Sequence, residues 1–106
     1  MAWLLRQGEV LASLEVGPAK WRRRRRRSAP GVGAVLIPRR RAHSFGARRA
    51  VDVAYLDADL VVVATSRLAP NRLGLPHRGV CSILEAEAGA FERWRLRPGD
   101  RLEIEE

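Results

Sequence analysis

HSFGARRAVDVAYLD, residues 43–57, combines a polar segment that begins at His43 with an apolar run that ends at Asp57. The run from residue 51 to 55 combines β-branched and aromatic side chains, which favour a pleated and buried surface. We expect a core strand that starts at Phe45 and Ala47 and continues through this run. This strand decides the fold class, because the rest of the chain also reads as short extended segments.

The residues after this strand predict its hairpin partner. Asp57-Ala58-Asp59 is typical of a tight turn, since aspartate side chains accept hydrogen bonds from nearby backbone groups. The unbroken apolar run from Leu60 to Ala64 then suits a central strand. Together the two strands form the clearest hairpin in the sequence.

A second hairpin is predicted at the N-terminus. Trp3 to Arg6 and Glu9 to Val16 are two apolar-leaning runs separated by Gln7-Gly8, a connection of two residues. In the second run, Val10, Ala12, Leu14 and Val16 alternate with other residues, so this set is expected to point inward.

Three more strands and a helix complete the pattern. Strands are expected at Ala34 to Ile37, at Gly79 to Glu85 and at Arg101 to Ile104, and a short helix is expected near residues 88–95. The sequence therefore predicts a mainly β (α+β) protein, a small antiparallel β-barrel or sandwich of about seven short strands with one or two short helices. Its 106 residues form a single domain, 1–106.

Four short sequence motifs give independent support for this fold, because together they resemble those of a known family. In addition to the stretch that ends in VDVAYLD, they are LAPNR at 68–72, ILEAEAG at 83–89 and LRPGDRL at 96–102. In this order and spacing, the chain resembles the "domain of unknown function 192" family, also called uncharacterised protein family 0127. The resemblance implies a mostly β fold with one short helix and no established activity. Relatives commonly have Met at position 47 and an aromatic-Pro pair at positions 49–50, whereas this chain has Ala47 and Arg49-Ala50.

Composition and the N-terminal sequence indicate the expected cellular location. The single Cys81 has no second cysteine for an internal disulfide, so the cytoplasm is the expected location. The N-terminus lacks the basic and apolar regions of a signal peptide, and no stretch reaches the roughly 18 apolar residues that a membrane-spanning helix needs.

The net charge of +8 is concentrated in one segment. Residues 20–49 hold twelve basic side chains and no acidic one, whereas residues 50–106 hold seven basic and ten acidic side chains. Residues 20–32 form either a loop or a poorly packed helix, because neighbouring arginines on a helix repel one another. An anionic partner, either nucleic acid or a membrane surface, is predicted to bind Arg22, Arg23, Arg24, Arg25, Arg26 and Arg27, and Arg39 to Arg41 extend this basic character.

Catalytic motifs are weak. His43 and Asp52 could form a base and its orienting carboxylate in a hydrolase, although a hydrogen-bonded loop histidine and a structural aspartate explain the same residues. Cys81 with His77 suggests a thiolate-imidazole pair, although a strand cysteine is usually a small buried apolar residue. We expect no metal site and no cofactor, because the spacing of histidine, cysteine and carboxylates matches no known ligand set.

The sequence thus favours a non-catalytic accessory module that binds a ligand or a protein. Its predicted binding surface is a concave face bordered by His43, Ser44, Phe45, Asp52 and Glu85. Two alternatives remain open: nonspecific binding of nucleic acid or anionic surfaces through Arg22 to Arg27, and hydrolase-like activity at His43 and Asp52. The identity of the partner is not predicted.

Overall fold

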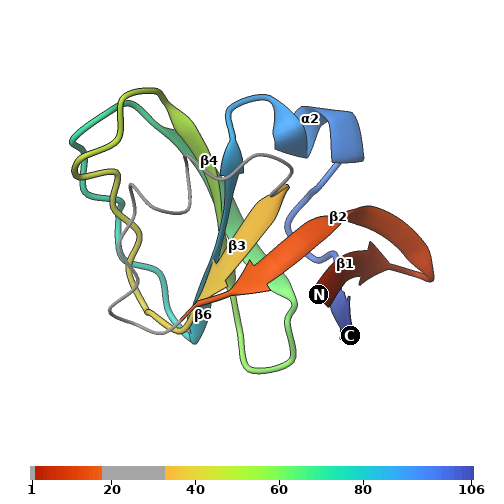
Figure 1. The fold of residues 1–106 in the computed structure, drawn as a ribbon. Coiled ribbons are helices and arrows are strands. Elements are labelled where there is room, and N and C mark those ends of the chain that lie inside the picture. Colours follow the sequence, from red (N-terminus) through yellow and green to blue (C-terminus); the bar gives the residue numbers. More distant parts are fainter. Residues whose placement is uncertain (1, 18–32) are drawn as a thin grey trace.

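The computed structural model describes residues 2–17 and 33–106. The segment predicted at 20–32, with Arg22 to Arg27, lies outside these residues. In the described part of the chain, seven strands form one sheet in the order β5-β4-β6-β3-β2-β1-β7 (Figure 1). The strands are β1 (Ala2–Arg6), β2 (Glu9–Val16), β3 (Ala34–Ile37), β4 (Val51–Leu56), β5 (Val62–Leu68), β6 (Ser82–Glu87) and β7 (Glu103–Glu105), and the helix is α2 (Ala90–Trp94).

The mainly β fold with seven strands and a short helix is confirmed, and two details of the expected antiparallel barrel or sandwich are corrected. β2 and β3 run parallel, with Leu14 opposite Ala34, so the sheet is mixed. The sheet also stays open. Residues 60–62 and 99–102 share backbone hydrogen bonds and one isolated bridge, Val61 to Arg101, but no continuous ladder joins β5 to β7 in the described chain.

Both predicted hairpins are present. β1 and β2 are antiparallel around Gln7 and Gly8, whose φ angles of 51° and 79° suit the twist of a two-residue hairpin turn. β4 and β5 are antiparallel, and Oδ1 of Asp57 accepts the backbone N–H groups of Asp59 and Val61 in the turn between them. The predicted turn chemistry of Asp57 is therefore confirmed.

Three strand details differ from the expectation. Phe45 and Ala47 lie in a loop, and β4 starts only at Val51. β5 is an edge strand instead of a central one, and it starts at Val62 because Leu60 takes a φ of 63°. In β2, only Leu14 of the four residues expected to point inward is fully buried, and a bulge opposite Leu4 and Leu5 shifts Val10 out of register with Ala12 and Leu14.

The sheet has an apolar core on each face. Alternation along β4 sends Ala54 and Leu56 to one face, where α2 adds Phe91. Val51, Val53 and Tyr55 point to the other face, which also contains Ala42 and Val80 from two long loops. No helix in the described residues is both apolar enough and long enough to span a bilayer.

Candidate functional site

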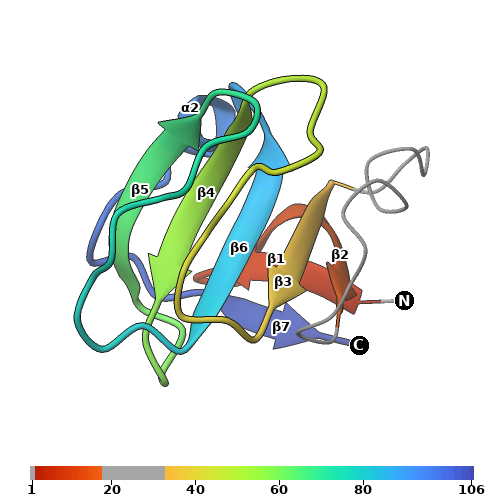
Figure 2. The same cartoon turned by 90° about the vertical axis from the view of Figure 1, so that its left-hand side faces the viewer.

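Two loops cover the second core and form what we call the paired-loop platform, residues 38–50 and 69–81. The first loop connects β3 to β4, and the second connects β5 to β6. Figure 2 shows both on the side of the sheet that faces the viewer, whereas α2 lies behind it. The two loops lie side by side because an antiparallel bridge between His43 and Leu73 joins them.

Ser44 joins the two loops at their centre. Its side chain is fully buried, with 0% exposure. The hydroxyl donates to the carbonyl of Ala69 and accepts the backbone N–H of Arg72 at 2.8 Å. The backbone N–H of Ser44 donates to the carbonyl of Arg72, also at 2.8 Å. A serine placed here satisfies buried polar groups of the opposite loop, so it fixes the position of one loop against the other.

Further hydrogen bonds extend this contact in both directions. The backbone N–H of Gly46 donates to Oδ1 of Asn71 at 3.0 Å, and Asn71 itself takes a φ of 60°. The backbone N–H of Gly74 donates to the carbonyl of Ala42, and Nε of Arg41 donates to the carbonyl of Gly74, each at 2.8 Å. The two loops are thus held together by main-chain and side-chain hydrogen bonds between residues 41–46 and 69–74.

His43 belongs to the platform and supports Phe45. The two rings stack with centroids 4.9 Å apart at an interplanar angle of 22°. Nε2 of His43 lies 2.7 Å from Nη1 of Arg39, and Nδ1 lies 3.3 Å from the backbone nitrogen of Phe45. A neutral imidazole accepts a hydrogen bond at one ring nitrogen only, so one of these two donors is bonded to the ring at a time. The ring stack holds Phe45 outward.

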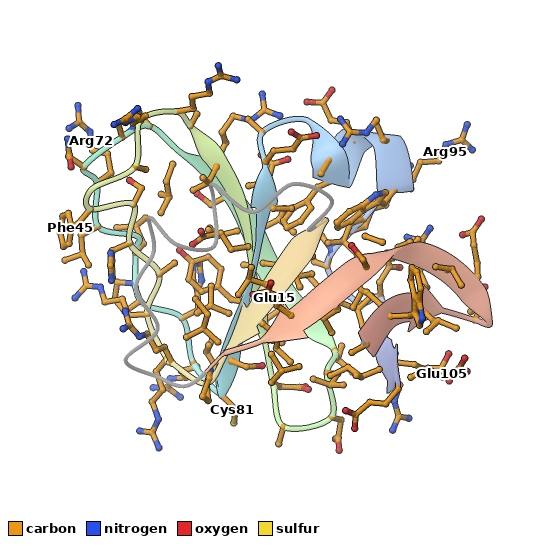
Figure 3. The ribbon with its side chains drawn as sticks, in the orientation of Figure 1. Glu15, Phe45, Arg72, Cys81, Arg95 and Glu105 are labelled. Atoms are coloured by element: carbon orange, nitrogen blue, oxygen red, sulfur yellow. The ribbon has the colours of Figure 1, made fainter. Side chains whose placement is uncertain are left out.

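The outer surface of the platform is basic and partly apolar. It carries seven arginines and no acidic residue, and all of the arginines except Arg39 are exposed: Arg39, Arg40, Arg41, Arg48, Arg49, Arg72 and Arg78. Three large apolar side chains stand among them, with exposures of 50% for Phe45, 49% for Leu73 and 74% for Leu75. Figure 3 shows Phe45 and Arg72 pointing outward on the same side of the molecule. Such a surface suits a partner that is both negatively charged and able to accept apolar side chains.

Asp52 lies on the opposite face of the sheet from the platform. Its carboxylate is buried, with Oδ1 paired to Nε of Arg67 at 2.9 Å. Oδ2 accepts the backbone N–H groups of Gly89 and Phe91, at 2.9 and 3.2 Å. The hydrogen bond that Arg67 donates to Asp52 is the main cause that raises the pKa of Arg67 above its ordinary value. Asp52 thus anchors the start of α2 and orients Arg67.

Glu85 is buried in β6 and points away from Asp52. In the sheet, Glu85 is opposite Val53, whereas Asp52 is opposite Ala86. Because consecutive residues of a strand alternate between faces, Asp52 and Glu85 belong to different faces. The five residues predicted to border one concave face are therefore not all brought together: Asp52 points to the opposite face, whereas Glu85 points to the face that the platform with His43, Ser44 and Phe45 covers.

Tyr55 is a buried residue that the sequence did not indicate as special. Its side chain has 0% exposure, and its hydroxyl has no hydrogen-bond partner among the described residues. Desolvation by burial raises the pKa of the phenol above 10.0, although the nearby charge of Arg41 acts in the opposite direction. The ring of His77 packs against Tyr55 at 4.4 Å, whereas Sγ of the exposed Cys81 contacts the carbonyl of Gly79 at 3.8 Å. His77 and Cys81 thus have different neighbours.

Within the described residues, no group of three or more histidine, cysteine or carboxylate side chains is arranged to hold a metal ion. The second half of the platform was missed at the sequence level. Except for His77 and Cys81, no residue of the second loop was indicated as a site residue from the sequence, although Leu73 and Leu75 stand in a stretch from 60 to 84 without any acidic residue. The absence of acidic residues was the signal that could have revealed this surface.

Comparison with known proteins places these observations in context. The model of the family DUF192, described as "Uncharacterized ACR, COG1430", matches residues 23–104. A crystal structure of a protein of unknown function from Novosphingobium aromaticivorans DSM 12444 is similar, with a TM-score of 0.71, 16% identity, and coverage of 96% of this chain and 82% of that chain. A "putative transcription regulator" from Sinorhizobium meliloti 1021 also has a TM-score of 0.71, with 20% identity and coverage of 97% and 91%. A search of curated proteins finds no match. At these identities the solved structures show a shared fold.

Proposed function

This chain belongs to the DUF192 family of uncharacterised proteins, and we propose that it is a non-catalytic module that docks through the paired-loop platform onto an anionic phospholipid surface. The observation that carries the proposal is the composition of the platform. Its two loops carry seven arginines, no acidic residue and three exposed large apolar side chains. Of the residues predicted to bind a ligand, His43 and Phe45 belong to this surface, and the buried Ser44 holds its two loops together.

Charge supplies the attraction. A basic side chain near an anionic leaflet contributes about 1 kcal/mol, and this contribution falls off within a Debye length of about 8 Å at physiological salt. Six of the platform arginines are exposed on the two loops. Even if only half of them reach the surface together, the expected attraction is about 3 kcal/mol, roughly a hundredfold in the binding constant.

The exposed apolar residues favour a bilayer over nucleic acid. Phosphates of nucleic acid need only cations and hydrogen-bond donors, so Leu73 and Leu75 would stay in water against a nucleic-acid backbone. Against a bilayer, the same side chains enter the boundary between headgroups and acyl chains, and each buried CH₂ contributes about 0.8 kcal/mol. Phe45 is already held outward by its stack on His43.

Rigidity of the platform lowers the cost of docking. Ser44 and the backbone bonds between the loops fix Phe45 and Leu73 before any partner arrives. Less conformational entropy is then lost on binding, which is the general advantage of a preorganised surface. A location in the cytoplasm is part of the proposal, and it fits because the cytoplasmic leaflet carries the negative surface potential.

The groups that a hydrolase would need are engaged in structural roles. The Ser44 hydroxyl is buried and hydrogen-bonded on both sides, and the Asp52 carboxylate bonds to Arg67, Gly89 and Phe91. His43 lies in a loop over one face of the sheet, while Asp52 points to the other face. This separation supports a binding role over the hydrolase alternative.

Vesicle sedimentation tests the proposal. We expect the protein to bind vesicles of phosphatidylcholine mixed with phosphatidylglycerol, and to bind pure phosphatidylcholine vesicles much more weakly. The double variant Phe45→Ser, Leu75→Ser should lose at least about tenfold in partitioning, because two apolar side chains no longer enter the bilayer. The matched control Val10→Ser, Ile104→Ser removes exposed apolar side chains outside the platform and should bind normally.

Two outcomes would overturn the proposal. One is an equal loss of vesicle partitioning in the platform variant Phe45→Ser, Leu75→Ser and in the control variant Val10→Ser, Ile104→Ser. The other is tight binding to single-stranded DNA combined with no binding to anionic vesicles.

The basic run gives a second candidate function, nonspecific nucleic-acid binding through Arg22 to Arg27. The observation in its favour is that the basic residues are concentrated in one segment of the sequence, and the name of the similar Sinorhizobium structure, a "putative transcription regulator", agrees with it. Neutralisation of six phosphates would give a log-log salt slope of about −5, or a loss of roughly three orders of magnitude between about 50 and 200 mM salt. A slope near zero for DNA binding would rule this candidate out.

A further inference from the structure

The outer edge of β5 offers unpaired backbone groups. β5 is the last strand of the sheet, next to β4 only. The carbonyl of Leu56 accepts the backbone N–H of Cys81, so the backbone groups of Leu56 point toward β6. Because these groups alternate along an antiparallel strand, the groups of Ala54 and Asp52 also point toward β6.

The residues opposite Ala54 and Asp52 on β5 are Thr65 and Arg67. They form the pairs without hydrogen bonds between the two strands, so their N–H and C=O groups point away from β4. No described residue pairs with these four groups. Residue 62, farther along the same edge, is already bonded to Gly99 and Asp100, and the free edge therefore begins after it.

A groove runs beside this free edge. It has a volume of about 510 Å³ and lies between β5 and the segment formed by α2 and residues 95–97. Thr65, Ser66 and Arg67 form one side, and Phe91 and Leu96 are buried apolar residues at its inner surface. The groove is shallow and open to solvent, so it suits an extended segment that stays partly exposed.

The charged groups at the groove favour an acidic occupant. The guanidinium of Arg67 is fixed by Oδ1 of Asp52 and by Oε1 of Glu92, each at 2.9 Å. Arg95 and Arg97 line the opposite side, and their side chains have no ion-pair partner in the described residues. Asp52 is buried and fully engaged, so the arginines dominate the part of the groove that an entering peptide meets.

We infer that the groove binds an extended acidic peptide segment of another protein, which adds to β5 as an eighth strand. The N–H and C=O groups of Thr65 and Arg67 supply up to four backbone hydrogen bonds, as in other cases of strand addition. Carboxylates at every second position of the peptide are about 6.8 Å apart and reach Arg95 and Arg97 on one face.

A second copy of this chain is a poor occupant of the edge. Symmetric pairing of two β5 strands would bring Arg67 of one copy close to Arg67 of the other, and like charges in opposed positions destabilise a strand pair. An acidic peptide meets no such repulsion. The site is separate from the paired-loop platform: Figure 3 shows Arg95 and Phe45 on opposite sides of the molecule.

The experiment uses a synthetic eight-residue peptide of alternating Glu and Val, titrated into the full chain and followed by NMR. We expect the amide signals of Thr65, Arg67 and Glu92 to shift. Arg95→Ala, Arg97→Ala should weaken binding about tenfold, because two charge contacts of about 0.7 kcal/mol each are lost. Arg48→Ala, Arg49→Ala removes the same charge from the platform and should leave the affinity for this site unchanged.

Backbone pairing is tested with two N-methylated peptides that differ in which alternate amides are blocked. One set should lose binding by tenfold or more, because its blocked amides face β5, while the other set should bind normally. The inference would be overturned if both N-methylated peptides bound with the same affinity, or if the two arginine variants lost the same peptide affinity. Vesicle binding is independent of this result, since the groove variant leaves the platform intact.

Discussion

Ser44 and Arg72 hold the two loops of the platform together through a reciprocal contact. The backbone N–H of Ser44 donates to the carbonyl of Arg72, and the backbone N–H of Arg72 donates to the Ser44 hydroxyl, each at 2.8 Å. The contact is buried at Ser44, while the Arg72 side chain remains exposed. A buried serine thus positions an exposed arginine that belongs to a surface built from two distant segments.

Ser44→Ala should destabilise the protein and loosen the platform. The substitution leaves the carbonyl of Ala69 and the N–H of Arg72 without their partner, which costs about 1–3 kcal/mol. Urea unfolding measures this loss, and hydrogen exchange should show faster exchange at residues 70–74 than in the wild type. Ser66→Ala, at a half-buried serine of β5, is the control and should change stability by less than about 0.5 kcal/mol. Equal effects of the two substitutions would contradict the role of Ser44.

Tyr55→Phe should stabilise the protein and change its response to alkaline pH. Removal of a buried hydroxyl without a partner is expected to contribute about 1 kcal/mol. Burial raises the pKa of Tyr55 above 10.0 in the folded state, so the phenol ionises first in the unfolded chain. Stability from this group is therefore fully present below about pH 10 and is lost as pH rises from there through the folded-state pKa.

Urea unfolding at about pH 8 and about pH 11 compares the two proteins. The wild type should lose more stability than Tyr55→Phe between these values. Since Tyr55 is the single tyrosine of the chain, its ionisation can also be followed directly by ultraviolet absorbance. A midpoint at or below 10 in the folded protein would contradict the effect of burial.

Gly74→Ala should be destabilising in a way that depends on Tyr55. A methyl group at position 74 would collide with the Tyr55 hydroxyl and would lie 3.2 Å from the carbonyl of Ala42. We expect a loss of about 1–3 kcal/mol, as for other overpacked sites. In a double-mutant cycle measured by thermal unfolding, Tyr55→Phe should recover part of this loss. Strict additivity of the two substitutions would show that the hydroxyl is not the obstacle.

Asp52→Asn should weaken the contact between the sheet and α2. Oδ2 of Asp52 accepts two backbone N–H groups and Oδ1 accepts Nε of Arg67, and an amide nitrogen in either position would replace an acceptor by a donor. We expect a loss of about 2–3 kcal/mol in urea unfolding. Asp59→Asn, at an exposed position, makes the same chemical change and should be nearly neutral. If both variants are equally stable, Asp52 is not the anchor of α2.

The sequence predicted the local structure well where turn chemistry is explicit. Gln7-Gly8 and Asp57 each specify a short connection, and both hairpins are present. Pairing between strands far apart in the sequence was not predictable in the same way. Alternation with a period of two shows which residues of a strand share a face, but it does not show which strand lies next to it. The parallel pairing of β2 with β3 and the edge position of β5 are examples.

The candidate site shows the same limit. His43, Ser44 and Phe45 are adjacent in sequence, so their grouping was already given. Asp52 and Glu85 are both buried carboxylates next to core strands, but the register between β4 and β6 sends them to opposite faces. The contribution of Leu73 and Leu75 depends on a loop that is brought to the first loop only by tertiary contacts.

The most direct test of the membrane-docking proposal compares two variants on vesicles that contain phosphatidylglycerol. One variant replaces Arg22 to Arg27 with Ser, and the other carries Phe45→Ser and Leu75→Ser. If the paired-loop platform is the docking surface, the first variant keeps measurable vesicle binding, and the second loses at least about tenfold relative to the wild type. Abolished binding in the first variant together with unchanged binding in the second would contradict the account.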